Sequence, residues 1–461
     1  MKAKCIVLFI MLYSAVNAQY KILHIFNDTN GMNPWGSLTL VGSKLYGLTQ
    51  YGGADKKGCI FSLDTNGSNY KDLFDFSPAN GEYPEFTQLT YSEKKLYGMA
   101  SEGGTHNAGC VFSIDTNGND YKVVFNFTGT TGWVPQGSVT ISGNRLYGMT
   151  AQGGIDGYGC IFSMDTNGNG YKKLLDFNDS NGKQPYGDLT LFNNVLYGMT
   201  YYGGKYNDGV IFSIDSNGSG YKKLLDFNDS NGANPLGSLT LSGSTLYGMT
   251  QKGGSQNSGC LFSMDTDGNT YKDLYNFGSF PFGSLILSGN TLYGMTPLGG
   301  QSAHGNIFSI DTNGNTYNNL FYFDKTDGSL PQGSLILSGN MLYGVTSGGA
   351  LDNNGVIFAF KDTNITTSIN EVKVNYNTIK VYPNPSNGVF TIVENGKLKM
   401  ENEQNTIEVY NVLGEKIYSQ LSTLNSQFSI DLSNQPNGIY LYRVITETGE
   451  LIGSGKLIIA H

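Results

Sequence analysis

The chain has 461 residues, of which 39% are hydrophobic and 13% aromatic, so it can build apolar cores and a largely disordered chain is excluded. Its 63 glycines favour turns over helices, and its net charge of -9 excludes the basic surface typical of nucleic-acid binding. We therefore expect an all-β protein that has no nucleic-acid partner.

Residues 1–18 have the layout of a secretory signal peptide. Lys2 and Lys4 precede an apolar run over residues 6–16, and small residues lead to an expected cleavage point before Gln19. The alternative is a short buried helix or strand. The run is too short to span a bilayer, and no other segment approaches the ~18 apolar residues of a membrane helix, so we expect export and no transmembrane segment.

The triplet Leu-Tyr-Gly recurs through residues 19–360 at a spacing close to 50 residues. It begins at Leu45, Leu96, Leu146, Leu196, Leu246, Leu292 and Leu342, with spacings of 51, 50, 50, 50, 46 and 50. Each repeat contains four short segments with period-two alternation, for example residues 221–227, 237–243, 245–250 and 259–265. Four strands in each of seven repeats predict a seven-bladed β-propeller.

The order of the segments within the repeats predicts that the propeller closes. A strand of the type Tyr-Lys-x-Leu begins at Tyr20, before the first repeat, whereas the last repeat ends at Phe360 without one. We expect the N-terminal strand to complete the last blade, because that pairing covers two open sheet edges.

The repeats resemble two known families. Residues 235–254 followed by residues 261–277 are similar to the kelch-type propeller unit, although most repeats lack its Trp. The closer resemblance is to the tandem-repeat family called GloVer, whose units have the pattern LYGxTxxGGxxxxGxxFxxD, and it extends over roughly residues 20–360. The resemblance implies a propeller and no established activity, so it supplies no catalytic residues.

Four cysteines occupy the same position of different repeats: Cys59, Cys110, Cys160 and Cys260. Val210, Asn306 and Val356 take this position in the other three. Sheets pack about 10 Å apart, beyond the ~7 Å that a disulfide spans, so we expect small buried side chains rather than a disulfide frame or a metal site.

One turn resembles an EF-hand calcium loop, with its ligand positions at Asp165, Asn167, Asn169 and Asp176. The glycine expected at its sixth place is missing from most repeats, and its twelfth residue falls inside a strand. We therefore expect a hairpin turn, with calcium as the alternative and no other cofactor.

No catalytic constellation is evident in the sequence. The four histidines are scattered over different repeat positions, and no nucleophile elbow or phosphate loop occurs. We favour a binding or adhesion protein for a glycan or surface partner. The alternatives are a secreted hydrolase or lyase that acts at the channel mouth, through carboxylates from two blades, and a purely structural surface protein.

Two sets of connections vary from repeat to repeat on one expected face, which is where recognition usually lies. One position holds Trp35, Gln136, Tyr186, Leu236, Phe282 and Gln332, with Phe86 close to it, and Trp133 lies in one of these connections. We take these eight residues as candidate ligand contacts. The equally supported alternative is that they plug the space between blades.

The repeat pattern ends after Phe360. Residues 361–376 are polar and aperiodic, as in a linker, and residues 377–461 contain short strands and turns compatible with a small β-sandwich. Several residues there resemble the type A C-terminal sorting domain of type IX secretion: Tyr382, Pro383, Asn384, Pro385, Gly388, Gly414, Gly438, Tyr440 and Lys456.

This resemblance implies a protein of the Bacteroidota that engages the type IX machinery and passes through the periplasm and the outer membrane. It also implies removal of the domain during release or during attachment to surface lipopolysaccharide. An adhesive sandwich module is the alternative. The sequence as a whole predicts an extracellular or cell-surface monomer.

Overall fold

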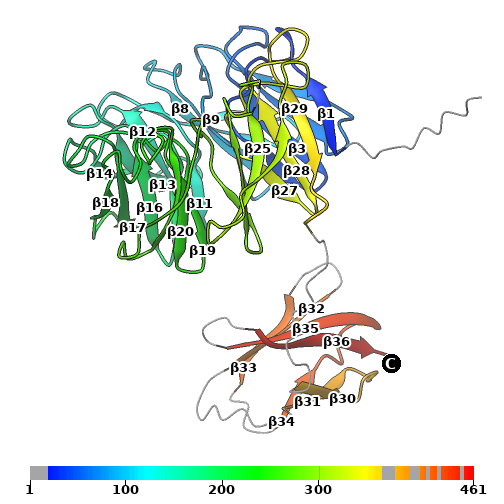
Figure 1. Ribbon diagram of the computed structural model, residues 1–461. Helices are drawn as coiled ribbons and strands as arrows, with labels where there is room; N and C mark the ends of the chain where they lie inside the picture. The colour runs from blue at the N-terminus through cyan, green and yellow to red at the C-terminus, as the bar shows by residue number, and fades with distance from the viewer. Residues whose placement is uncertain are drawn as a thin grey trace, which may run out of the picture. The chain divides into compact units, whose positions relative to one another are not determined.

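The computed structural model describes residues 19–300, 302–365, 379–394, 405–411, 416–422, 427–446 and 451–460. Every regular element in these ranges is a β-strand, and they contain no helix long and apolar enough to cross a bilayer (Figure 1). The chain divides into two compact units, Met1–Ile365 and Thr366–His461. The expected signal peptide, residues 366–376 of the expected linker, and Gly414 lie outside the described residues.

The first unit contains seven small antiparallel sheets within residues 20–361, which we call the repeat region. Each sheet begins at one edge with a three-residue strand: β2 (Thr39–Val41), β6 (Thr90–Ser92), β11 (Thr140–Ser142), β15 (Thr190–Phe192), β19 (Thr240–Ser242), β23 (Ile286–Ser288) and β27 (Ile336–Ser338). The second strand carries the Leu-Tyr-Gly triplet: β3 (Lys44–Thr49), β7 (Lys95–Ala100), β12 (Arg145–Gln152), β16 (Val195–Thr200), β20 (Thr245–Met249), β24 (Thr291–Thr296) and β28 (Met341–Thr346).

The third strand begins at the Cys, Val or Asn position: β4 (Cys59–Asp64), β8 (Cys110–Asp115), β13 (Cys160–Asp165), β17 (Val210–Asp215), β21 (Cys260–Asp265), β25 (Asn306–Asp311) and β29 (Val356–Lys361). The fourth strand forms the other edge: β5 (Lys71–Asp75), β9 (Lys122–Asn126), β14 (Lys172–Asp176), β18 (Lys222–Asp226), β22 (Lys272–Asn276), β26 (Asn318–Tyr322) and, in the seventh sheet, β1 (Tyr20–Ile25). A short extra strand, β10 (Trp133–Pro135), pairs with β12 in the third sheet.

The seventh sheet combines the two ends of the repeat region, because β1 pairs with β29 (Figure 1). Tyr20 lies opposite Phe360, and Ile25 lies opposite Val356. The Tyr20 ring also stacks on Phe321 of the sixth sheet at 4.2 Å, and its hydroxyl donates to the Asp327 carbonyl at 2.6 Å. The expectation that the N-terminal strand completes the last sheet is confirmed.

The Leu-Tyr-Gly triplet recurs because its glycine makes room for a phenylalanine of the neighbouring strand. In the first sheet Gly47 lies opposite Phe61, and a Cβ on Gly47 would overlap the Phe61 ring. Each sheet has this pair: Gly47–Phe61, Gly98–Phe112, Gly148–Phe162, Gly198–Phe212, Gly248–Phe262, Gly294–Phe308 and Gly344–Phe358. The pair lets a large ring be fully buried inside each sheet.

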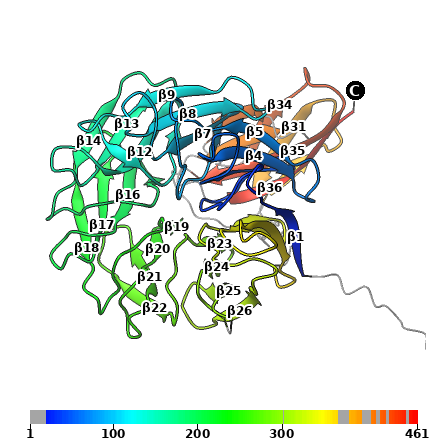
Figure 2. The same ribbon diagram turned by 90° about the horizontal axis from the view of Figure 1, so that it is seen from above.

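The same phenylalanines join neighbouring sheets. Each packs at a ring distance of 5.1–5.6 Å on a phenylalanine that follows a fourth strand, for example Phe26 on Phe61. Seven buried apolar clusters lie between successive sheets, and the last joins the seventh sheet to the first. The sheets therefore form a closed cycle, with their short first strands toward a common centre (Figure 2).

The four repeat cysteines are free and buried, as the sequence predicts. They also make polar contacts: the Cys59 sulfur lies 3.2 Å from the Thr49 hydroxyl and 3.6 Å from the Asn30 carbonyl. Burial raises the pKa of Cys110 to about 12, so this thiol stays protonated and unreactive at neutral pH.

The C-terminal unit contains two antiparallel sheets. One is formed by β30 (Ile379–Tyr382), β31 (Val389–Glu394) and β34 (Gln427–Asp431), and the other by β32 (Asn405–Tyr410), β33 (Lys416–Ser422), β35 (Gly438–Thr446) and β36 (Leu451–Ile459). Both contribute to one buried core, with Phe390 and Ile430 from the first and Val409, Val444 and Leu457 from the second.

The Pro-Asn-Pro-Ser segment connects these two sheets. The Asn384 side chain donates to the Lys456 carbonyl at 2.6 Å and accepts from the Ile458 N–H at 2.8 Å. Gly388 has a φ of 109°, and a Cβ there would lie 2.5 Å from the Ser433 Cα, so this position requires glycine. Tyr440 is buried and donates to the Pro436 carbonyl at 2.8 Å, whereas Tyr382 and Lys456 are exposed.

Glu408 is the centre of a charged cluster in the same unit. Its carboxylate lies 3.0 Å from Lys416 Nζ and 2.6 Å from Arg443 Nε, and it accepts from the Tyr410 hydroxyl at 2.7 Å. The hydrogen bonds from Tyr410, Lys416 and Arg443 lower the pKa of Glu408 to about 2. The carboxylate therefore stays charged over the physiological range.

Candidate functional site

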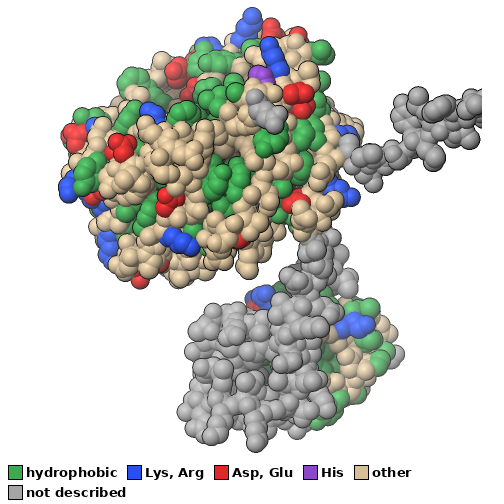
Figure 3. All heavy atoms as spheres, viewed as in Figure 1, with side chains coloured by type: hydrophobic (Ala, Val, Ile, Leu, Met, Phe, Trp, Pro, Cys, Tyr) green, Lys and Arg blue, Asp and Glu red, His purple; other side chains and the backbone are tan. Residues whose placement is uncertain are grey.

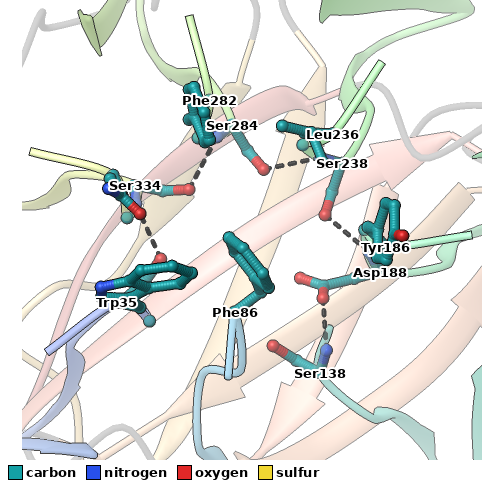
Figure 4. A pocket seen from close by; sticks show the side chains of 17 residues that line it. Trp35, Phe86, Ser138, Tyr186, Asp188, Leu236, Ser238, Phe282, Ser284 and Ser334 are labelled. Carbon is teal, nitrogen blue, oxygen red and sulfur yellow. Dashed lines mark hydrogen bonds between the residues drawn. The ribbon is translucent and has the colours of Figure 1, made fainter. Parts of the chain in front are cut away.

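Seven short segments, each directly before the first strand of a sheet, meet at the centre of the repeat region. We call them the axial ring: residues 35–37, 86–88, 136–138, 186–188, 236–238, 282–284 and 332–334. Most of these residues line one central cavity (Figure 4). Charged side chains of both signs are scattered over the face of the repeat region seen in Figure 3, without a large patch of one sign.

The backbone of the axial ring is held by contacts between neighbouring segments. The Ser334 N–H donates to the Ser37 hydroxyl at 2.8 Å, and the Ser284 N–H donates to the Ser334 hydroxyl at 2.8 Å (Figure 4). Glycines precede the ring serines because the segments approach closely: a Cβ on Gly283 or Gly333 would overlap the carbonyl of the next segment. The ring is thus a rigid support for the side chains before each glycine.

Asp188 takes the place of a serine in this ring, and its carboxylate accepts from the Ser138 N–H (Figure 4). Its own N–H donates to the Ser238 hydroxyl at 2.7 Å. Burial raises the pKa of Asp188, and the hydrogen bonds from Ser138 and Ser238 oppose that shift. The carboxylate is therefore engaged in holding the ring together.

Aromatic side chains form a continuous run across the ring. Trp35 and Phe86 lie 5.1 Å apart, and Phe86 lies 6.3 Å from Tyr186. The Tyr186 ring contacts the Tyr201 ring edge to face, with 5.3 Å between the ring centroids. The Tyr201 ring contacts the Tyr202 ring in the same way at 4.5 Å. Trp35, Phe86, Tyr186 and Tyr201 are half-buried, so their rings keep accessible surface.

Phe86 reaches the middle of the ring because its connection is one residue longer than the others (Figure 4). Pro34 is followed directly by Trp35, whereas Glu85 is inserted between Pro84 and Phe86. The cavity that remains around Phe86 has a volume of about 30 Å³, which holds one or two water molecules. A ligand of larger size would have to lie on the aromatic surface rather than inside the channel.

The inserted Glu85 gathers two glutamines beside this aromatic run. It accepts from the Nε2 atoms of Gln50 and of Gln136, the latter at 2.8 Å. Gln50 is 3% and Gln136 is 6% exposed, and the Oε1 atom of each has no hydrogen-bond partner in the described part of the chain. Burial raises the pKa of Glu85, against the hydrogen bonds from Gln50 and Gln136. Both amide oxygens are buried acceptors without a partner among the described residues.

The structure brings most of the predicted contact residues together. Six line the cavity of the axial ring: Trp35, Phe86, Tyr186, Leu236, Phe282 and Gln332. Gln136 lies in the ring with its side chain on Glu85. Trp133 lies outside the ring, in β10 opposite Gln152, and is 46% exposed.

The candidate calcium residues lie on a hairpin that separates them. Asp165 ends β13, whereas Asp176 ends β14 and lies opposite Cys160, at the other end of the antiparallel pair. Asp165 pairs with Arg145 at 3.0 Å and Asp176 with Lys173 at 2.8 Å. Asn167 accepts from the Asn169 N–H at 3.0 Å, as in an Asx turn. Among the described residues no group of three or more His, Cys, Asp and Glu side chains could hold a metal.

Sequence reasoning missed Glu85, Gln50, Tyr201 and Asp188. The signal for Glu85 was the spacing of 51 between the first two triplets, which marks the inserted residue. Tyr201 follows a Leu-Tyr-Gly strand at a position that also varies between repeats, and its hydroxyl donates to Gln251 Oε1 at 2.6 Å. Aromatic faces beside amide and carboxylate groups are suited to stacking on sugar rings and to hydrogen bonding of hydroxyls.

The fold and this ring define a tandem-repeat, all-β protein with a candidate binding surface at the centre of its sheets. The model of the Gloeobacter/Verrucomicrobia repeat matches residues 9–144, 85–257 and 232–398, so the chain belongs to this repeat family. The secretion system C-terminal sorting domain matches residues 380–460. The resemblances to the GloVer repeat and to the sorting domain are confirmed, and the sorting domain indicates engagement of the type IX system and an extracellular or cell-surface location.

No curated protein matches the chain. Among solved structures, an oligogalacturonate lyase in complex with manganese has a TM-score of 0.48 and 13% identity, over 73% of this chain and 91% of that chain. A Mycobacterium tuberculosis puromycin-hydrolyzing peptidase has a TM-score of 0.49 and 11% identity, over 80% of this chain and 62% of that chain. The extracellular domain of BT4673 from B. thetaiotaomicron has a TM-score of 0.47 and 12% identity, over 93% of this chain and 57% of that chain. The chain spans less than two thirds of the last two, and none of these similarities carries an activity over to it.

Proposed function

We propose that the seven sheets of the repeat region are the blades of a closed seven-bladed β-propeller. Three features support this: the shared seventh sheet, the seven clusters between neighbouring sheets, and the axial ring at their centre. We also propose that the two sheets of the C-terminal unit form a β-sandwich over their common core.

On this scaffold the axial ring serves as a binding surface for a glycan or a surface partner. The single observation that carries the proposal is the half-buried aromatic run from Trp35 to Tyr202. The rings would stack on a sugar face. Export to the cell surface places this surface where extracellular glycans are encountered.

A glycan array combined with a screen of hydrolase and lyase substrates tests this function. We expect saturable binding of one glycan class by the purified protein, without release of products. Turnover of a bound glycan would replace the binding role by catalysis. Absence of saturable binding to any glycan or to a surface extract would leave a structural protein and contradict the proposal.

A further inference from the structure

The sixth sheet, β23 to β26, carries a pocket that has no part in the axial ring. Its volume is about 360 Å³, against about 30 Å³ at the ring centre. Its walls come from the fourth strand of the fifth sheet, the segment 298–300 and the sixth sheet itself. Three departures from the repeat fall at this pocket, and each changes its lining.

The first departure is a shortened connection between the fifth and sixth sheets. Seven residues separate Phe227 from Pro235 in the preceding repeat, but three separate Phe277 from Pro281, which explains the spacing of 46. In the fifth sheet this connection covers the fourth strand, because the Tyr271 hydroxyl donates to the Asn231 carbonyl at 2.6 Å. The shorter connection of the sixth sheet leaves Tyr317 exposed to a pocket.

The second departure is Asn306, which stands where other repeats have Cys or Val. It is 2% exposed, and its Oδ1 accepts from the Thr296 hydroxyl. Its Nδ2 lies 3.3 Å from the Tyr317 hydroxyl and 2.5 Å from Asn319 Oδ1. The floor of the pocket is therefore a chain of amide and hydroxyl groups, where a thiol or a methyl group would otherwise lie.

The third departure is Tyr322 at the end of β26. In four other sheets an Asp or Asn at this position accepts from the backbone of the segment after the Gly-Gly pair, as Asp226 does from the Lys205 N–H at 2.7 Å. Tyr322 lacks that acceptor geometry, is 46% exposed, and forms a wall of the pocket together with Tyr275.

The chemistry of the lining selects the occupant. Among the described residues its lining includes no Asp, Glu, Lys, Arg or His, so a charged ligand would lose hydration without a partner there. Aromatic rings and neighbouring amides are complementary to a ring that has one apolar face and several hydroxyls. We propose that this pocket binds one pyranose residue of a neutral saccharide. The site is independent of the axial ring and does not rest on the function proposed for it.

The test uses saturation-transfer NMR on the full exported chain with the methyl glycosides of glucose, galactose and mannose. We expect transfer to the ring protons of at least one of them. Asn306→Val should weaken that binding at least tenfold, and should leave the melting temperature nearly unchanged because Val210 and Val356 occupy the same position in other sheets. Asn306→Cys also removes the amide and introduces the residue that four other repeats have at this position, so it should weaken binding as Asn306→Val does.

A second variant replaces residues 278–280 by the sequence of residues 228–234, so that the pocket is covered as in the fifth sheet. It should abolish the transfer that Asn306→Val weakens, whereas Asn167→Ala, in the turn between β13 and β14, should leave that transfer unchanged. Methyl galacturonide should bind more weakly than methyl galactoside. Absence of transfer from all three neutral glycosides, or transfer unchanged in both the Val and the covered variant, would overturn the proposal.

Discussion

The repeat region and the C-terminal unit are both all-β, but they distribute their stabilising contacts differently. In the repeat region the same glycine–phenylalanine pair is made once in each of seven sheets and recurs about every 50 residues. In the C-terminal unit Asn384 and Gly388 each make their contacts once. Repetition spreads stability over many equivalent contacts, so a single repeat can change, as the sixth has, while a change at Asn384 has no equivalent to replace it.

Deletion of residues 20–26 should have the largest effect on the repeat region. It removes β1, exposes an edge of β29, and removes Phe26 from the cluster between the seventh and first sheets. We expect loss of the cooperative thermal transition, measured by circular dichroism.

The matched control is a chain in which residues 20–26 follow Lys361 through a Thr-Asn-Gly-Asn-Gly turn, as residues 166–170 connect Asp165 to Tyr171. It should recover the transition. An unchanged melting temperature after the simple deletion would contradict closure of the sheets through β1.

Deletion of residues 377–461 should separate the two units functionally. Because the sorting domain matches residues 380–460 and the repeat region has its own cores, the truncated protein should keep its melting temperature but stay in the periplasm. Cell fractionation with protease accessibility measures its location. Normal surface display of the truncated chain would contradict the sorting role.

Glu408→Gln should destabilise the C-terminal unit by about 1–3 kcal/mol, because it removes the charge that Lys416, Arg443 and Tyr410 contact. The half-exposed Lys416 and Arg443 keep the effect below that of a fully buried pair. Denaturant unfolding of the full chain, followed by a probe in each unit, should show the shift only in the C-terminal transition. An equal shift in both transitions would show that the units unfold together.

His24→Phe should have the smallest effect, and only below neutral pH. His24 stacks on Tyr70 at 3.7 Å, and burial lowers its pKa to about 4, against a hydrogen bond with Asn30. Between pH 6.5 and 4 the unfolded chain binds a proton there that the folded chain does not, so stability falls as pH falls through this range.

The melting temperature of the Phe variant should fall less than that of the wild type between pH 6.5 and 4, because the contribution of His24 is absent. The other titrating groups contribute equally to both proteins. Phe74 and Phe125 occupy the same position in other sheets, so the substitution fits. Parallel melting curves of wild type and variant from pH 7 to pH 4 would refute the role of His24.

The strand pattern and the sharing of the seventh sheet could be predicted from sequence because period-two alternation and the phase of the repeat are local signals. The buried position of Cys59 followed from its alternation with Val210. The axial position of Trp35, Tyr186 and Phe282 followed from their common place in the repeat, since equivalent residues of a closed cycle surround one centre.

Other features depend on contacts between repeats and could not be predicted from any single one. Glu85 gains its role from Gln50 and Gln136, which come from the first and third sheets. Trp133 shares a variable connection with the ring residues, yet it pairs with β12 instead of reaching the centre. The pocket beside Asn306 arises because the connection from Phe277 to Pro281 is four residues shorter than in the preceding repeat. A search for motifs does not detect such a deletion.

The central claim is that the aromatic residues of the axial ring bind ligand rather than only filling the space between sheets. The most direct test is a paired measurement of melting temperature and glycan affinity for Trp35→Ala and Tyr186→Ala, with Asn167→Ala in the opposite turns as the control. Binding predicts an affinity loss of tenfold or more with little change in melting temperature. If the side chains only fill the space between the sheets, each substitution should lower the free energy of unfolding by about 3 kcal/mol or more. That loss of stability with unchanged affinity per folded molecule would contradict the account.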